Sequence, residues 1–70
     1  MKKLLKEYDL TEVYQYYDMI IDSVINGQRE QAKNQFLAMP KDYQKRFLSE
    51  ILFHSYSDLT TSDKEMFVKI

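Results

Sequence analysis

The sequence has few of the residues on which catalytic and metal sites depend. It contains no cysteine, so disulfide bonds and thiolate metal sites are excluded. The single histidine, His54, cannot build a zinc site alone, and its position favours a structural role at a helix end. The single glycine, Gly27, leaves no glycine-rich loop for phosphate. We therefore expect no catalytic residue, no metal site and no cofactor, and hence a protein that is not an enzyme.

Long apolar runs are also missing. A membrane-spanning helix needs roughly 18 or more consecutive apolar residues, and no run in this chain reaches that length. The start of the chain is basic, but its apolar stretch is only Leu4-Leu5, which is too short for a signal peptide. We therefore expect a cytoplasmic protein with no membrane partner.

The chain is 70 residues long, which allows one small domain over residues 1–70. A chain of this size buries only about 60% of the surface that it exposes when unfolded, so its stability is marginal. Hydrophobic residues make up 44% of the sequence, which is too many for a disordered chain. Helix packing, self-association or folding against a partner must therefore supply the stability.

Apolar residues recur at helical spacing, and no alternating run suggests a strand. The pattern predicts an all-α protein, a small antiparallel bundle of three main helices over residues 9–26, 28–39 and 41–54. A short C-terminal helix is expected over residues 62–69. Residues 1–8 are expected to form a docking arm or a short helix.

The first main helix has a signal at each end. Asp9 with Glu12 has the spacing of a capping box, with Thr11 as a competing cap, and Gly27 is suited to the left-handed residue that ends a helix. At about 100° per residue, its main apolar residues fall in one arc of about 140°. These residues are Val13, Tyr14, Tyr17, Ile20, Ile21, Val24 and Ile25.

The later helices have their own signals. Pro40 ends the second helix and can begin the third, and Ser62 with Glu65 has capping-box spacing for the last one. The second helix has a narrow apolar stripe of Ala32, Phe36 and Met39. The third has a wide one of Tyr43, Phe47, Leu48, Ile51 and Leu52, which is typical of a helix between two neighbours.

Charges are nearly balanced, 10 basic against 11 acidic, but they are segregated along the chain. Residues 1–6 carry only basic side chains, residues 7–27 only acidic ones, and residues 28–46 mostly basic ones. The simplest interpretation is that the acidic and basic helices lie side by side and complement one another. Asp18 and Asp22 are one helical turn apart, and a solvated helix face explains them better than metal binding.

Several large apolar residues do not fit the stripes of their helices. Tyr16 and Met19 lie off the main arc and, with Glu12 and Ser23, follow a second line along the first helix. Tyrosine, methionine and phenylalanine are enriched in interface cores. We therefore expect a non-enzymatic protein-interaction module, an adaptor, inhibitor or self-associating protein, in the style of small phage or mobile-element proteins. The candidate interface residues are Glu12, Tyr16, Met19, Ser23, Leu37 and Phe53. The alternative is that the rest of the bundle covers these residues.

A basic cluster supports a second hypothesis. Arg29 and Lys33 are one turn apart, and Lys41, Lys45 and Arg46 open the third helix. If the Pro40 turn brings them together, they form a positive patch that could contact phosphates. The alternative function is therefore a small nucleic-acid-binding regulator. The apolar residues on the third helix argue against that helix as a base reader.

Overall fold

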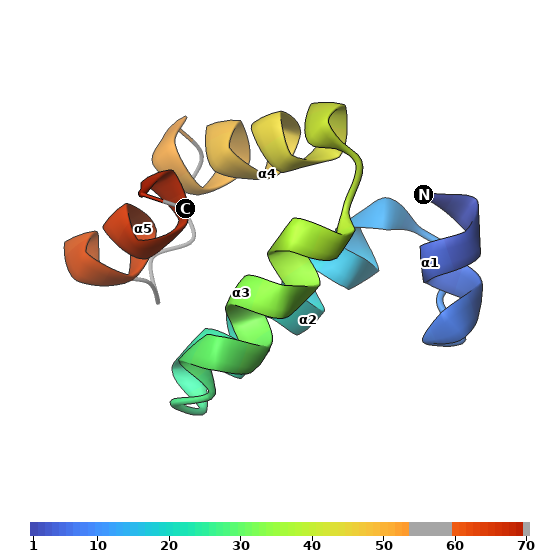
Figure 1. Cartoon of the computed structure of the whole chain (residues 1–70), viewed down its shortest axis with the longest axis horizontal. Coiled ribbons are helices and arrows are strands. Elements are labelled where there is room, and N and C mark those ends of the chain that lie inside the picture. The colour runs from blue at the N-terminus through green and yellow to red at the C-terminus, as the bar shows by residue number, and fades with distance from the viewer. Residues whose placement is uncertain (54–59, 70) are drawn as a thin grey trace.

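The computed structural model describes residues 1–53 and 60–69, apart from the side chains of Leu52 and Phe53. Within these residues the chain forms five helices and no strand, which confirms the all-α class (Figure 1). The helices are α1 (Lys2–Glu7), α2 (Val13–Ile25), α3 (Arg29–Ala38), α4 (Lys41–Phe53) and α5 (Thr61–Val68). The antiparallel arrangement of the whole bundle stays a prediction.

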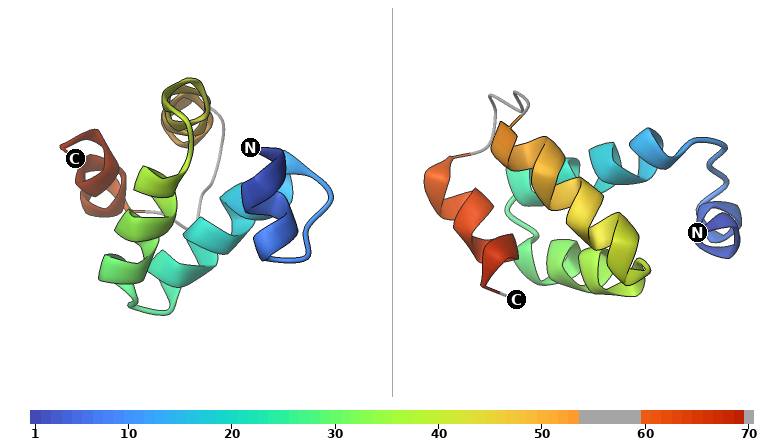
Figure 2. Two further views of the ribbon diagram at one scale, coloured as in Figure 1. Left: turned by 45° about the vertical axis from the view of Figure 1, so that its right-hand side comes forward. Right: turned by 90° about the horizontal axis from the view of Figure 1, so that it is seen from above.

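The helices are arranged around the pair α2 and α3, which lie side by side (Figures 1 and 2). Helix α4 crosses this pair and packs against α5. Helix α1 lies at the opposite end of the molecule from α5, so the two ends of the bundle are built from the two shortest helices.

The core is centred on four aromatic rings from four helices. Phe47 of α4 contacts Tyr17 of α2, Phe36 of α3 and Phe67 of α5, with ring centroids 5.3, 5.7 and 5.2 Å apart. Such tilted and edge-on ring pairs add to the free energy gained from burial. The stripe predicted for the second helix is confirmed, because all three of its members are buried: Ala32, Phe36 and Met39.

The end of α1 differs from the prediction. Asp9 does not cap α2, because it adopts a left-handed conformation, with φ 56°, just after α1. The Asp9 amide donates to the Lys6 carbonyl and the Leu10 amide donates to the Leu5 carbonyl. This pair of bonds is the Schellman motif that ends helices, and aspartate is one of the few non-glycine residues that tolerate the left-handed region.

A Schellman motif also ends α2, with Gly27 as the left-handed residue that was predicted there. Gly27 has φ 80°, its amide donates to the Val24 carbonyl, and the Gln28 amide donates to the Ser23 carbonyl. The prediction for Gly27 is therefore confirmed. The turn folds α3 back beside α2 (Figure 2).

Helix α2 begins at Val13, four residues later than predicted. Its first turn is held by the Gln15 side chain, whose Oε1 accepts from the amides of Glu12 and Thr11 at 2.9 Å. Neither Asp9 nor Thr11 is the N-cap residue, which is Glu12.

The last two helices begin close to where they were expected. The Pro40 carbonyl accepts from the amides of Tyr43 and Gln44 in the first turn of α4, so proline directly precedes the first residue of that helix, Lys41. The predicted cap of α5 is wrong by two residues, because the capping box consists of Thr60 and Asp63 instead of Ser62 and Glu65. Threonine and aspartate serve the same two bonds.

Candidate interaction surfaces

The buried face of α2 is rotated away from the predicted arc by about 50°, at about 100° per residue. Tyr14 and Ile25, predicted to lie inside, are 60% and 52% exposed. Tyr16 and Ser23, predicted to lie on the outer line, are 0% and 4% exposed. Their placement as surface residues is therefore wrong.

Polar contacts to α3 explain this rotation. The Tyr16 hydroxyl donates to the backbone carbonyl of Gln35 at 2.6 Å. The Ser23 hydroxyl lies 3.0 Å from the Gln35 side-chain oxygen and 3.1 Å from the Met19 carbonyl. Since Gln35 is itself buried, these groups satisfy one another inside the bundle.

Tyr16 is also covered from the side of α1. The Tyr8 ring packs edge-on against the Tyr16 ring, with centroids 5.7 Å apart. Burial raises the pKa of the Tyr16 phenol from 10.0 to about 12, with further contributions from Tyr8 and Glu7. The phenol is therefore a neutral hydrogen-bond donor at physiological pH. Tyr16 thus joins α2 to α3 through a buried hydrogen bond.

The other candidate interface residues are placed differently. Glu12 is exposed and Met19 is half-buried against the core. Leu37 is 51% exposed on α3. The side chain of Phe53, like the whole of His54, lies outside the described residues. The predicted line of Glu12, Tyr16, Met19 and Ser23 is therefore not exposed along its length.

The rotation of α2 leaves a different set of residues on its outer side. Tyr14, Asp18, Asp22 and Ile25 are all exposed, and they lie within about 80° of the helix circumference. We call these four residues the acidic–apolar face. It combines an aromatic ring, a branched aliphatic side chain and two carboxylates.

The expected charge pairing between acidic and basic helices is not observed. Among the described residues, no ion pair joins an acidic residue of the segment 7–27 to a basic one of the segment 28–46. The carboxylates of Asp18 and Asp22 are therefore without an ion-pair partner in the described part of the chain.

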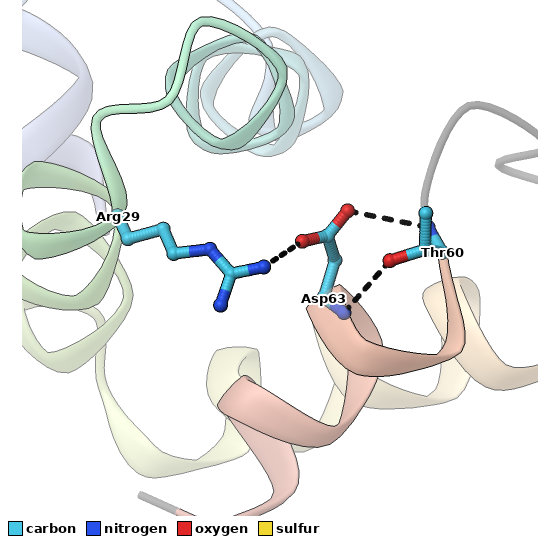
Figure 3. Close-up of polar contacts among 3 residues, drawn as sticks. All are labelled: Arg29, Thr60 and Asp63. Atoms are coloured by element: carbon cyan, nitrogen blue, oxygen red, sulfur yellow. Dashed lines mark hydrogen bonds and ion pairs between the residues drawn. The ribbon is translucent and has the colours of Figure 1, made fainter.

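Arg29 pairs instead with the far end of the chain. Its Nη2 lies 2.5 Å from Oδ1 of Asp63, whose side chain is 15% exposed (Figure 3). The other oxygen of Asp63 accepts from the Thr60 amide at 3.2 Å, and the Thr60 hydroxyl accepts from the Asp63 amide. One carboxylate thus caps α5 and ties it to the first residue of α3.

The basic residues predicted to cluster are spread along α3 and α4. Arg29 begins α3, whereas Lys41, Lys45 and Arg46 follow the other end of that helix, which is about 14 Å long. Lys33 is half-buried, and the Arg46 guanidinium lies over the Tyr43 ring at 5.1 Å. The cluster is therefore not one patch, although its three members on α4 are exposed.

A cleft beside α1 was not anticipated from the sequence. It has a volume of about 340 Å³ and is lined by Lys2, Lys3, Leu5, Lys6, Leu10 and Thr11. We call it the α1 cleft. Its apolar floor follows from the Schellman motif after α1, because this motif commonly brings together the two residues that occupy the positions of Leu5 and Leu10.

The signal for the α1 cleft was the block of three lysines in residues 1–6. Its geometry was missed because Asp9 was interpreted as the start of α2 instead of the end of α1. When Asp9 ends α1, the chain turns so that Leu10 lies near Leu5, and both line the cleft together with the three lysines.

A protein with this fold and these surfaces belongs to the class of small all-α helical bundles. No protein-family model, curated protein or solved structure matches the chain significantly. None of the described helices is long and apolar enough to cross a membrane. Over the same residues, no group of three or more His, Asp or Glu side chains is placed to hold a metal ion.

Proposed function

We propose that this chain is a small non-enzymatic protein-interaction module that acts in the cytoplasm. One observation supports the proposal above others: the acidic–apolar face. Tyr14 and Ile25 are each more than half exposed, beside two carboxylates that lack ion-pair partners in the described chain. Aromatic residues are enriched in interfaces, and a ring beside unpaired charges suits a partner with a basic and apolar surface.

The position of the acidic–apolar face strengthens this proposal. It lies on α2, whose opposite side is fixed by core packing and by the Tyr16 bond to α3. A surface on a rigid helix binds without the entropy loss of ordering a loop. This face replaces the outer line through Tyr16 and Ser23 as the proposed contact region, and Leu37 stays a separate candidate on α3.

Affinity capture from the native host, followed by mass measurement, tests the proposal. The variant Tyr14→Ser/Ile25→Ser should lose the captured protein, because both changes remove apolar contact area without touching the core. Val68→Ser, which alters an equally exposed apolar residue on α5, is the matched control and should retain it. Equal capture by both variants would refute the proposal.

The alternative, a nucleic-acid-binding regulator, draws on Lys41, Lys45 and Arg46. Its support is weaker because Arg29 is paired with Asp63 and lies at the far end of α3. This alternative predicts DNA or RNA binding that falls steeply with salt. Absence of binding at low salt would remove it.

A further inference from the structure

The chain carries two exposed surfaces of opposite charge and similar design. The α1 cleft places Lys2, Lys3 and Lys6 around an apolar floor. The acidic–apolar face places two carboxylates beside apolar side chains. Each surface offers what the other needs, a basic rim for carboxylates and an apolar depression for a ring or an aliphatic group.

The two surfaces do not pair within one chain. No ion pair joins the lysines of α1 to any acidic residue of the described chain. Helix α2 runs away from α1, which lies at one end of the molecule (Figures 1 and 2). Their complementarity is therefore available only to a second molecule.

We infer that two copies of this chain form a dimer in which the α1 cleft of each copy receives the acidic–apolar face of the other. The inference rests on the proposed function and names the partner as a second copy. The volume of about 340 Å³ falls in the range of small-ligand pockets, about 300–1,000 Å³, and can take one apolar side chain of the face.

A reciprocal contact of this kind closes on itself. When the cleft of one copy holds the face of the other, a two-fold axis places the second cleft on the second face. The dimer thus uses both complementary pairs and leaves neither surface for a third copy. Assembly stops at two chains, with a mass of about 17 kDa, twice the 8.5 kDa of one chain.

Charge reversal on each surface tests the pairing. In Asp18→Lys/Asp22→Lys both faces become basic and meet basic clefts, and in Lys2→Glu/Lys6→Glu both clefts become acidic and meet acidic faces. Each variant alone should therefore be monomeric. An equal mixture of the two should form a heterodimer, because each of its two contacts again joins opposite charges.

Size-exclusion chromatography with light scattering gives the mass, and circular dichroism shows that each variant is folded. The matched control is Glu30→Lys/Asp42→Lys, which changes the net charge by the same amount at exposed positions on α3 and α4. The control should stay dimeric. For the wild-type chain, the dimer should weaken about tenfold or more between about 0.1 M and 1 M salt, because the Debye length falls from about 10 Å to about 3 Å.

Three results would overturn the inference. The wild-type chain could be monomeric up to millimolar concentration, the reversed variants could dimerise alone, or their mixture could stay monomeric. The wild type could be monomeric while its capture of another protein still depends on Tyr14 and Ile25. This result would refute the dimer but support the proposed function. A dimer with the expected charge behaviour supports both.

Discussion

Removal of one hydroxyl group, in Tyr16→Phe, tests how α2 is fixed to α3. The Tyr16 hydroxyl donates to the Gln35 carbonyl, which lies in the last turn of α3. The Met39 amide, one helical turn further on, donates to the Phe36 carbonyl instead. Tyr16 therefore satisfies one of the carbonyls that a helix end leaves unpaired.

The magnitude follows from the burial of both groups. Phenylalanine keeps the ring of Tyr16 and its packing, so the loss is the hydrogen bond and the unpaired carbonyl of Gln35. A buried acceptor left unsatisfied costs about 1–3 kcal/mol. A 70-residue domain has roughly 4–10 kcal/mol of stability, so the variant loses a large share. Its Tm should fall by about 4–8 °C for each kcal/mol lost.

Tyr14→Phe is the matched control on the same helix, because Tyr14 is 60% exposed. Its stability should stay within about 0.5 kcal/mol of the wild type. Urea unfolding followed by circular dichroism measures both variants. Equal stability of Tyr16→Phe and the wild type, or an equal loss in both variants, would refute the assignment of the bond.

The pKa of Tyr16 adds a second, independent reading. Because the folded-state pKa of about 12 exceeds the unfolded value of 10.0, the unfolded chain releases its proton first as the pH rises. The stability that this group contributes is therefore complete below about pH 10 and is lost between about pH 10 and 12. The difference in unfolding free energy between the wild type and Tyr16→Phe should shrink across this window. A constant difference would contradict the raised pKa.

The remaining predictions concern the helix ends and the core. Asp63→Ala should cost about 1–2 kcal/mol, because it removes both the carboxylate that accepts from the Thr60 amide and the ion pair, whereas Arg29→Ala should cost less than about 1 kcal/mol. In urea unfolding at high salt, only the Arg29→Ala loss should disappear, and equal salt sensitivity would contradict the capping role. Gly27→Ala should lower stability by about 1 kcal/mol through its φ of 80°, and Gly27→Asn by less, so equal Tm values for the two would argue against backbone strain. Phe47→Ala should cost about 3–5 kcal/mol and leave much of the chain unfolded at 37 °C, as circular dichroism would show; a cooperative melt near the wild-type Tm would contradict its central place in the ring cluster.

Periodicity was enough to predict the four helices after α1, although α2 begins four residues later than expected. The helix ends near Gly27 and Pro40 could be predicted because they depend on the backbone properties of glycine and proline themselves. The structure has a helix end at each of these residues. The buried stripe of α3 could also be predicted from the sequence. In a polar helix, three apolar residues at helical spacing define one face that can pack against the core.

The face of α2 could not be predicted in the same way. Periodicity treats tyrosine as apolar and serine as polar, whereas the orientation depends on what their hydroxyls meet across the helix pair. For Tyr16 and Ser23 that partner is Gln35, which a sequence pattern does not place. Asp9 was ambiguous for a related reason, since aspartate suits both a helix N-cap and a left-handed turn. The α1 cleft depends on that second choice.

Helix α1 has one buried side chain, Leu5, and is otherwise attached to the bundle by the partly buried Met1 and Leu4 and by the Tyr8 ring that follows it. Such a segment opens locally at a lower free energy than the rest of the domain. Its amides should therefore exchange with deuterium while those at the centres of α2 and α4 remain protected. If a second copy occupies the α1 cleft, opening also requires the partner to leave, and this protection rises with protein concentration. The exchange rate of the α1 amides, compared with that of the amides in α2 and α4, would then measure the fraction of chains that are in the dimer.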